Sequence, residues 1–292
     1  MAGELIRLGV PKGSLQDATI KLFAKAGWNI RLHHRNYFPD IDDPEIKCSL
    51  SRAQEMAMYV ERGTFDVGLT GKDWVMENDS DVVVVDDLIY SKVSNRPARW
   101  VLCVAGNSPF KRPEDLEGKK IATELVGFTE KYFKSIGVNV DVSFSWGTTE
   151  AKVVEGLCDA IVEITETGTT IKANGLRIIA ELMQTNTQLI ANKEAWADPA
   201  KRKKIEEMNL LLQGALRAEK LVGLKMNMPK AKMEEAQDVM PAQTSPTVAE
   251  LKDPNWVSVE IVVEESIVRD IIPQLRGLGA EAIIEYPLNK VI

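Results

Sequence analysis

Short apolar runs alternate with segments of helical periodicity from the start of the chain. Leu5 to Val10 is one such run, and the apolar positions after it recur every three or four residues up to Gly27. Further on, the pattern predicts a helix from about Ser51 to Arg62 and buried strands at Phe65 to Leu69 and Val82 to Val85. Buried strands separated by amphipathic helices are typical of a parallel sheet with crossover helices, so the sequence predicts an α/β fold.

A second α/β unit follows in the middle of the chain. Its expected strands are Trp100 to Ala105, Lys119 to Thr123, Val138 to Val142, Ala160 to Ile164, Leu176 to Leu182 and Thr185 to Ala191. Helices are expected at Thr129 to Ile136 and at Thr149 to Leu157, and a longer helix follows Pro199. We expect this longer helix to return the chain to the first unit, with the basic run Lys201 to Lys204 as a solvated face.

From Leu221 onward the order of elements changes. The expected strands are Leu221 to Met228, Val257 to Val263 and Ala280 to Tyr286, with a short extended piece near Ser245 to Val248. Helices are expected over Lys230 to Val239 and over Ser266 to Leu278. The order βαββαβ over about 70 residues is that of a ferredoxin-like unit, which favours a separate small domain.

Length and charge narrow the classes of function. The 292 residues favour two or three domains over a single core. A net charge of −7 argues against binding a nucleic-acid backbone, so any anionic ligand must be held by local groups. The three cysteines stand far apart, outside any Cys-x-x-Cys pair. With neither a signal-like apolar stretch nor a membrane-length apolar run, the chain is expected to be cytoplasmic, without a membrane partner.

The segment from Asp159 to Thr170 carries the most informative chemistry. It is an apolar strand that ends in acidic residues and continues into the turn Thr-Gly-Thr-Thr. Backbone N–H groups and hydroxyls converge at such a turn, which can hold a phosphate monoester without many cations. The carboxylate of Glu163 suits a vicinal diol, because an ionised acid accepts the hydrogen bonds that sugar hydroxyls donate. A hydroxyl-rich helix cap without a ligand would have a similar composition, and that alternative stays open.

Two further glycine-containing segments could approach a ligand. Pro11-Lys12-Gly13 joins the first strand to its helix, where Lys12 offers a point charge and Gly13 permits close backbone approach. The second segment is Gly68-Leu69-Thr70-Gly71-Lys72-Asp73, and Arg52 begins the helix before it. Taken singly, each is also compatible with an ordinary turn or a solvated side chain.

In this order, the segments resemble the long form of the ATP phosphoribosyltransferase family. The strand, the acid and Thr-Gly-x-Thr resemble that family's loop for phosphoribosyl pyrophosphate (PRPP), with Glu150 and Gly156 upstream of it. Pro11 to Gly13 is similar to its Pro-Lys-Gly loop, and Gly68 to Asp73 to its Gly-x-x-Gly-x-Asp loop. The resemblance covers nearly the full chain.

The resemblance implies three domains. A two-domain, type II periplasmic-binding-protein-like catalytic core would be followed by a C-terminal ferredoxin-like regulatory domain. Catalytic domain I would comprise residues 1–92 and 180–218, and catalytic domain II, with the PRPP loop, residues 93–179. Residues 219–292 would form the regulatory domain that binds histidine.

The implied reaction transfers the 5-phosphoribosyl group of PRPP to N1 of ATP and releases pyrophosphate. It is the first step of histidine biosynthesis, and the resemblance implies feedback inhibition by histidine, with AMP as a further candidate inhibitor. Mg²⁺ held mainly by the substrate pyrophosphate is the implied cofactor, and no metal ligand in the chain is assigned. A homodimer as the catalytic unit and a hexamer as the full assembly are expected.

The resemblance also assigns candidate contacts. Those for PRPP are Glu150, Glu163, Thr165, Glu166, Thr167, Gly168, Thr169 and Thr170. Those for ATP and phosphate are Pro11, Lys12, Gly13, Arg52, Thr70, Gly71, Asp73 and Glu124. Those for the inhibitor histidine are Asn227, Thr247, Val262 and Ala282.

Three departures from the family pattern affect these contacts. Glu163 stands where Asp is usual. The segment Thr123-Glu124-Leu125-Val126 lacks the Tyr-Pro found there in the family, so an aromatic contact to a substrate is missing. Asn227 replaces an acid, which would weaken a charge-assisted bond to the histidine amine.

Two other functions fit the same fold. A solute-binding protein would hold its ligand in the cleft between domains, but it would need export. A catalytically silent regulatory chain would assemble with an active partner and would have lost the PRPP loop, which is intact here.

Overall fold

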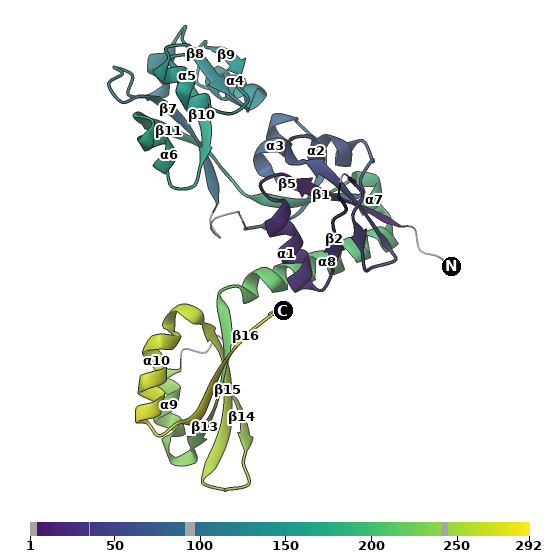
Figure 1. Cartoon of the computed structure of the whole chain (residues 1–292), viewed down its shortest axis with the longest axis vertical. Helices are drawn as coiled ribbons and strands as arrows, with labels where there is room; N and C mark the ends of the chain where they lie inside the picture. The colour runs from purple at the N-terminus through teal and green to yellow at the C-terminus, as the bar shows by residue number, and fades with distance from the viewer. Residues whose placement is uncertain (1–4, 35, 91–96, 241–244) are drawn as a thin grey trace. The chain divides into compact units, whose positions relative to one another are not determined.

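The computed structural model describes residues 5–34, 36–90, 97–240 and 245–292. They form two compact units (Figure 1). The first contains the residues up to Ala24 and Trp28–Asn209, and the second contains Lys25–Gly27 and Leu210–Ile292. The expected boundary between residues 92 and 93 lies outside the described residues.

The first sheet of the first unit has the order β4-β1-β5-β12-β6. These strands are β4 (Ile46–Arg52), β1 (Ile6–Lys12), β5 (Val67–Gly71), β12 (Thr187–Ala191) and β6 (Val83–Leu88). Strand β1 pairs in parallel with β4 and β5, whereas β12 runs antiparallel to β5 and β6. A late strand thus returns to this sheet, as a type II periplasmic-binding-protein-like fold requires.

Two adjacent glycines allow a helix to pack closely on this sheet. Gly9 of β1 pairs with Gly68 of β5, and α2 (Ala53–Glu61) covers them. A Cβ at Gly9 would lie 2.4 Å from Sδ of Met56, and one at Gly68 would lie 2.8 Å from it. Both positions therefore require the smallest residue so that the buried Met56 side chain can fill the space between strands and helix.

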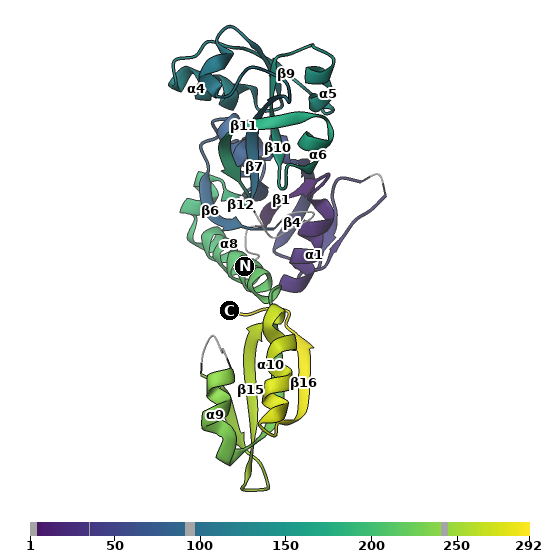
Figure 2. The same cartoon turned by 90° about the vertical axis from the view of Figure 1, so that its left-hand side faces the viewer.

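The second sheet of this unit has the order β11-β7-β10-β8-β9. These strands are β11 (Leu176–Thr185), β7 (Ala98–Ala105), β10 (Ala160–Thr165), β8 (Lys120–Thr123) and β9 (Asp141–Phe144). Its helices are α4 (Val126–Ser135), α5 (Thr149–Val154) and α6 (Thr169–Ala173) (Figure 2). Trp100 and Leu102 of β7 belong to one buried cluster, and Val101 and Cys103 belong to another. Both faces of the sheet are therefore covered, which explains why its strands read as continuous apolar runs.

Several short elements escaped the sequence pattern. They are β2 (Ile30–Arg31), β3 (Asp40–Ile41), β4, α3 (Lys72–Glu77), the 3-10 turn Pro113–Leu116 and α7 (Lys193–Ala197). The predicted strand at Val138 to Val142 begins only at Asp141, and the predicted burial of Val82 to Val85 is wrong, because Val84 is 48% exposed. Strand β6 lies at the edge of its sheet, where fewer neighbours cover it.

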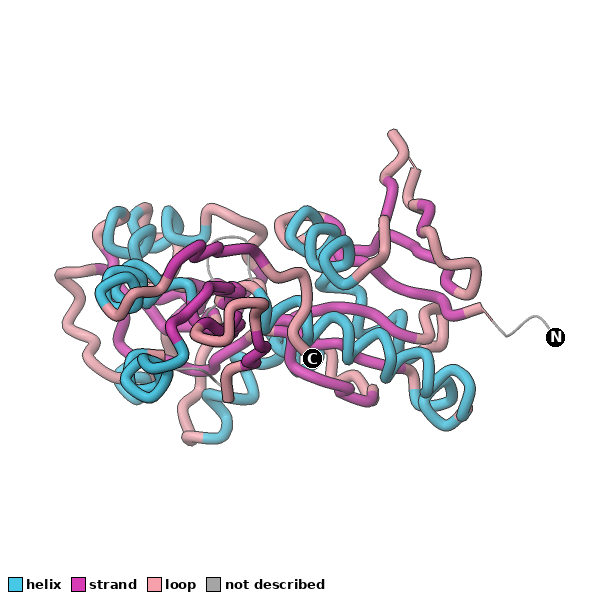
Figure 3. The backbone as a smooth tube through the Cα atoms, turned by 90° about the horizontal axis from the view of Figure 1, so that it is seen from below, coloured by secondary structure: helices cyan, strands magenta, loops and turns pink. Residues whose placement is uncertain are grey.

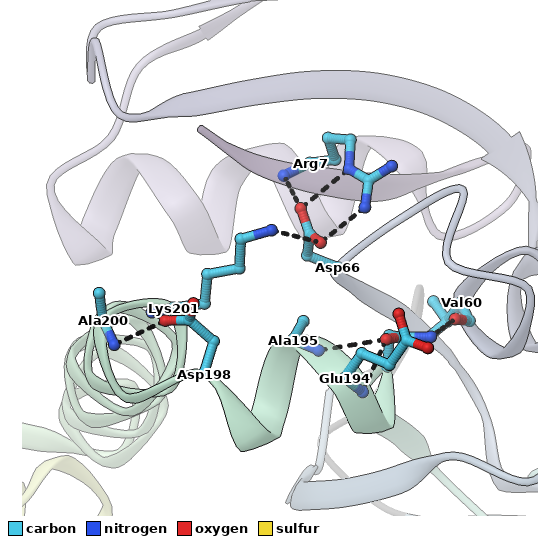
Figure 4. A network of polar contacts seen from close by, with 9 residues as sticks. Arg7, Val60, Asp66, Glu194, Ala195, Asp198, Ala200 and Lys201 are labelled. Atoms are coloured by element: carbon cyan, nitrogen blue, oxygen red, sulfur yellow. Dashed lines mark hydrogen bonds and ion pairs between the residues drawn. The ribbon is translucent and has the colours of Figure 1, made fainter. Parts of the chain in front are cut away.

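The predicted helices of the first part of the chain include α1 (Gln16–Ala26) and the long helix α8 (Pro199–Ala218), which begins with a defined cap. The Asp198 carboxylate accepts hydrogen bonds from the N–H groups of Ala200 and Lys201, at 2.8 and 3.0 Å (Figure 4). An acceptor at this position satisfies amides that a helix leaves unpaired at its start.

The basic run at the start of α8 is only partly a solvated face, which corrects the prediction. Nζ of Lys201 lies 3.3 Å from Oδ1 of the buried Asp66, which also receives two hydrogen bonds from the Arg7 guanidinium (Figure 4). Burial alone would raise the pKa of Asp66, but its hydrogen bonds from Arg7 and the charges of Arg7 and Lys201 hold it below its usual value. Lys203, in contrast, has a side chain that is 77% exposed.

The second unit is an antiparallel sheet with the order β14-β15-β13-β16. Its elements are β13 (Leu221–Pro229), the 3-10 turn Lys230–Lys232, α9 (Met233–Val239), β14 (Thr247–Glu250), β15 (Trp256–Glu264), α10 (Glu265–Gly277) and β16 (Glu281–Pro287) (Figure 1). Figure 3 colours the helices of the chain cyan and its strands magenta. Alternate residues such as Leu224 and Val259 pack with α9 and α10 on one face. This order confirms the predicted ferredoxin-like unit.

Within the described residues, no helix combines the length and apolar character needed to cross a membrane.

We expect Lys201→Met to lower the free energy of unfolding by about 1 to 2 kcal/mol, since it leaves the buried Asp66 carboxylate with one cationic partner fewer. Urea unfolding measures the change. The matched control is Lys203→Met, whose ion pair with Glu207 spans 3.9 Å and is exposed, so its effect should stay within about 0.5 kcal/mol. Equal losses in the two variants would contradict the role of Lys201.

Candidate functional site

A cavity of about 470 Å³ lies in the first unit, between residues of its two sheets. Seven of the predicted ligand contacts line it: Lys12, Gly13, Arg52, Gly71, Asp73, Glu124 and Glu166. The first five come from the first sheet and its connections, and the last two come from segments that follow strands of the second sheet. The fold thus brings together residues that lie more than 150 positions apart in the chain.

Three neighbouring parallel strands end at this cavity. Lys12, Arg52 and Gly71 are the last residues of β1, β4 and β5. Lys12 and Arg52 are register partners, so two cations stand side by side. Ligands of open α/β sheets bind outside the carboxyl ends of parallel strands, and paired cations at this edge suit a polyphosphate.

The turn after β1 exposes its backbone to the cavity. Pro11 is buried, whereas Lys12 and Gly13 are exposed. Gly13 has φ of +109°, which only glycine adopts without strain. Nζ of Lys12 lies 4.3 Å from the centroid of the Tyr37 ring, so the ammonium group is held by a cation–π contact.

The segment at residues 70–73 is more structural than its sequence suggested. The hydroxyl of the fully buried Thr70 donates to the carbonyl of Ala53, at 2.7 Å. The Asp73 carboxylate is also buried and accepts a hydrogen bond of 2.8 Å from Nε1 of Trp100, a residue of the second sheet. A Cβ at Gly71 would lie 1.9 Å from Oδ1 of Asp73, so Gly71 is needed for this carboxylate to fold back.

The turn after β10 has the geometry expected of a phosphate-binding loop. Gly168 has φ of +78° and its N–H donates to Oγ1 of Thr165, at 2.8 Å. The hydroxyls of Thr167 and Thr169 lie 2.8 Å apart, and both side chains are exposed, as is that of Thr170. Helix α6 begins at Thr169, so its first-turn amides point out of the same turn.

Carboxylates gather beside this turn. Burial raises the pKa of Glu163 to about 7, and the negative charges of Glu150 and Glu124 add to the rise, against hydrogen bonds from the Ile164 N–H and the Thr149 hydroxyl. Burial and the charge of Asp73 raise the pKa of Glu124. Groups with raised pKa values in a cleft are candidates for binding or catalysis.

In the second unit, three of the predicted histidine contacts share the sheet face opposite the helices. Asn227 of β13 pairs with Ser258 of β15, and Thr247 of β14 pairs with Glu260. Because β15 alternates, Ser258, Glu260 and Val262 point to one face, away from the buried positions 257, 259, 261 and 263. Ala282 has φ of +50° and lies where the pairing of β16 with β13 shifts register.

Several cavity residues were not predicted. Tyr90 follows β6, Trp100 lies in β7, Thr185 is the last residue of β11, and Asn186 and Thr187 lie where β12 begins. Nothing in the local sequence marks Asn186 and Thr187, because they reach the cavity through the return of β12 to the first sheet. Among the residues that the structure describes, no group of three or more His, Cys, Asp or Glu side chains is placed to hold a metal ion.

Comparisons with known proteins find close relatives over the full chain. A family model described as ATP phosphoribosyltransferase matches residues 52–214, and a model described as HisG, C-terminal domain, matches residues 218–290. The chain is 71% identical to an ATP phosphoribosyltransferase of Solidesulfovibrio magneticus over 293 residues, which cover 100% of both chains. It is 65% identical to an ATP phosphoribosyltransferase of Nitratidesulfovibrio vulgaris over 287 residues, 98% of each chain.

A solved structure supports the fold. The ATP phosphoribosyl transferase (HisG:HisZ) complex from Thermotoga maritima superimposes with a TM-score of 0.63 at 24% identity. The match covers 74% of this chain and 99% of the other.

The raised pKa of Glu163 predicts how stability varies with pH. Because the folded-state pKa of about 7 lies above the ordinary 4.5, the folded chain binds this proton more tightly than the unfolded chain does. The contribution of Glu163 to the free energy of unfolding is therefore present below pH 4.5. It is lost as the pH rises to 7, which lowers the free energy of unfolding by roughly 3 kcal/mol.

Glu163→Gln should remove this part of the pH dependence, as measured by urea midpoints of the first unit from pH 5 to pH 8. Glu130→Gln removes an exposed carboxylate of the same unit and should behave like the wild type. A midpoint that falls with pH as steeply in Glu163→Gln as in the wild type would disprove the assignment.

Proposed function

Because this chain belongs to the ATP phosphoribosyltransferase family, we propose that the turn at residues 165–170 holds the phosphate of PRPP and that Glu163 and Glu150 accept hydrogen bonds from its ribose hydroxyls. The chain transfers the 5-phosphoribosyl group of PRPP to N1 of ATP and releases pyrophosphate, the first step of histidine biosynthesis. The family membership favours this activity over the two alternatives, a solute-binding protein and a catalytically silent regulatory chain. The observation that carries the residue assignment is the left-handed turn at Gly168, beside the carboxylate cluster.

The phosphate end of the site uses backbone and hydroxyl groups. The amides of the first turn of α6 and the hydroxyls of Thr167, Thr169 and Thr170 supply donors to a phosphate. Thr165 shapes the turn through its bond from Gly168, and Glu166 lines the adjoining cavity. Donors without net charge fit a chain whose overall charge is −7.

The ribose lies against Glu163 in this arrangement. The ionised carboxylate accepts hydrogen bonds from the vicinal hydroxyls, and Glu150 stands near it at the start of α5. Departure of pyrophosphate leaves positive charge on the ribose ring, and an ionised Glu163 stabilises that charge more than a protonated one does.

Lys12 and Arg52 receive the phosphates of ATP and the departing pyrophosphate. Their places at the ends of adjacent strands, with the open backbone of Gly13 beside Lys12, support this assignment. Mg²⁺ enters as part of the PRPP substrate, where it neutralises charge on the pyrophosphate. Adenine N1 carries its own lone pair, so the protein's task is to position it and to stabilise the leaving group.

Two of the predicted ATP contacts act indirectly. Thr70 anchors α2 to β5, and Asp73 of α3 accepts a hydrogen bond from Trp100 of the second sheet. We assign both to the shape of the site, together with Pro11 and Gly71, while Glu124 stands in the cavity near the reacting groups.

Residues 219–292 form the proposed histidine-binding regulatory domain, after catalytic domain I (1–92 and 180–218) and domain II (93–179). The shared face of Asn227, Thr247 and Val262, with Ala282 at the adjacent bulge, supports a single effector site. The Asn227 amide binds the amine of histidine less strongly than an acid would. AMP inhibition and the dimeric and hexameric states belong to the same proposal.

Replacement of Thr169 and Thr170 together by Ala should raise KM for PRPP roughly tenfold or more, with KM for ATP changed less than about twofold, because two donors to the sugar phosphate are lost. Initial rates of phosphoribosyl-ATP formation measure both constants. The Thr169→Ser/Thr170→Ser protein keeps the hydroxyls and should restore the wild-type value. Equal increases for both substrates would refute the assignment.

Thr247→Ala should leave kcat within about twofold and weaken inhibition by histidine roughly fivefold or more, since one polar contact to the effector is lost. Inhibition curves at fixed substrate concentrations measure it. Ser266→Ala removes an exposed hydroxyl of the same unit, on the helix side, and should leave inhibition unchanged. Wild-type inhibition of Thr247→Ala would place the effector site elsewhere.

A further inference from the structure

Trp146 is exposed in a way that the other tryptophans of the chain are not. It retains 67% of its accessible surface, whereas the remaining five of the six tryptophans are buried or half-buried. Exposure of a large indole gains nothing for folding, because its apolar surface stays in water. The exposed indole of Trp146 is therefore available to bind a ligand.

The loop that carries Trp146 is held firmly at both ends. Ser145 and Thr149 are buried, their hydroxyls lie 3.0 Å apart, and the Ser145 N–H donates to the carbonyl of Thr123. Between them, Gly147 and Thr148 both have positive φ, of +69° and +47°. A threonine in the left-handed region is strained, and strain of this kind persists where the surrounding structure imposes it, often at functional sites.

The indole stands beside a residue of the cavity. The Arg52 guanidinium carbon lies 5.6 Å from the Trp146 ring, and Arg52 lines the cavity of about 470 Å³. The Phe144 ring lies 5.8 Å from that of Trp146 and steadies it. The loop therefore presents a flat aromatic surface at the edge of the proposed substrate site.

The reaction requires the adenine ring close to this loop. N1 of adenine must reach the anomeric carbon of the ribose, and the ribose is proposed to lie against Glu163 and Glu150. Helix α5 begins immediately after the loop with Thr149 and Glu150, and the Thr149 hydroxyl donates a hydrogen bond to Glu163. The adenine ring must therefore lie within a few ångströms of this end of α5, which is within reach of an indole four residues before Glu150.

We propose that Trp146 is the stacking surface for the adenine ring of ATP and so a determinant of acceptor binding in this chain. Stacking on an aromatic ring is a sequence-tolerant way to hold a base, and the Arg52 contact keeps the indole oriented. Trp146 would supply the aromatic contact that the segment Thr123 to Val126 lacks. The proposal rests on the proposed ribose position, and its test is chosen to fail separately from it.

Trp146→Ala should raise KM for ATP roughly tenfold and leave KM for PRPP and kcat within about twofold. Trp146→Phe keeps an aromatic face and should recover most of the loss. The matched control is Trp196→Ala, which removes a half-buried tryptophan that likewise lies over an arginine, 4.7 Å from the Arg202 guanidinium carbon. Arg202, unlike Arg52, does not line the cavity, so this variant should leave both KM values unchanged.

A binding measurement separates stacking from a general effect on the loop. Fluorescence quenching by ATP should be larger in the wild-type protein than in Trp146→Phe, and tripolyphosphate, which lacks the base, should produce no such difference. An unchanged KM for ATP in Trp146→Ala, a parallel rise for both substrates, or equal quenching in the two proteins would overturn the proposal. If the PRPP assignment alone were wrong, the Thr169→Ala/Thr170→Ala protein would keep its KM for PRPP while the Trp146 results stood.

Discussion

The reversal of the chain after β10 is the constraint on which the rest of the site depends. A strand buried in the middle of its sheet ends at Thr165, and a helix begins at Thr169. The chain accomplishes this change of direction through a left-handed Gly168, fixed by the bond from its N–H to Thr165. Any residue with a Cβ would be strained there, and the amides and hydroxyls around it would no longer converge on one point.

An acidic protein that binds two polyanionic substrates must arrange its few cations locally. Lys12 and Arg52 achieve this by ending adjacent parallel strands in register, while the sugar phosphate is left to neutral donors. Glu163 is subject to two opposing effects. Burial and its acidic neighbours favour its protonated form, whereas the proposed contact with the ribose requires the ionised form. Hydroxyl groups of the substrate, and positive charge that develops on the ribose, both favour ionisation. Binding of the substrate therefore favours the ionised form of Glu163.

Much of the fold of the first unit followed from apolar patterning because its central strands, such as β5, β7 and β12, are buried on both faces. The βαββαβ order of the C-terminal unit was readable for a different reason: its sheet is covered on one face, so apolar and polar residues alternate along its strands. Strand β4 was missed although Ile46, Cys48 and Leu50 alternate with polar residues, a pattern that does indicate a half-buried strand. Strand β6 was misjudged because an edge strand can be apolar without being covered. The chain's return to the first sheet as β12 was predicted only through the family resemblance.

The site was predictable where the chemistry is local. The motifs Thr-Gly-Thr-Thr and Pro-Lys-Gly each indicate a ligand-binding turn from only three or four consecutive residues. The Asp73 carboxylate binds Trp100, 27 positions away, and the Lys201 ammonium group binds Asp66, 135 positions away. No local sequence pattern could reveal either contact. The same holds for Asn186 and Thr187, which reach the cavity only through sheet topology.

A crystal structure of the chain with PRPP and Mg²⁺ bound would test the proposed PRPP site most directly. We expect the 5-phosphate against the amides and hydroxyls of residues 167–170, with the ribose diol at Glu163 and the pyrophosphate toward Lys12 and Arg52. A 5-phosphate bound elsewhere, with the turn around Gly168 free of ligand, would contradict it.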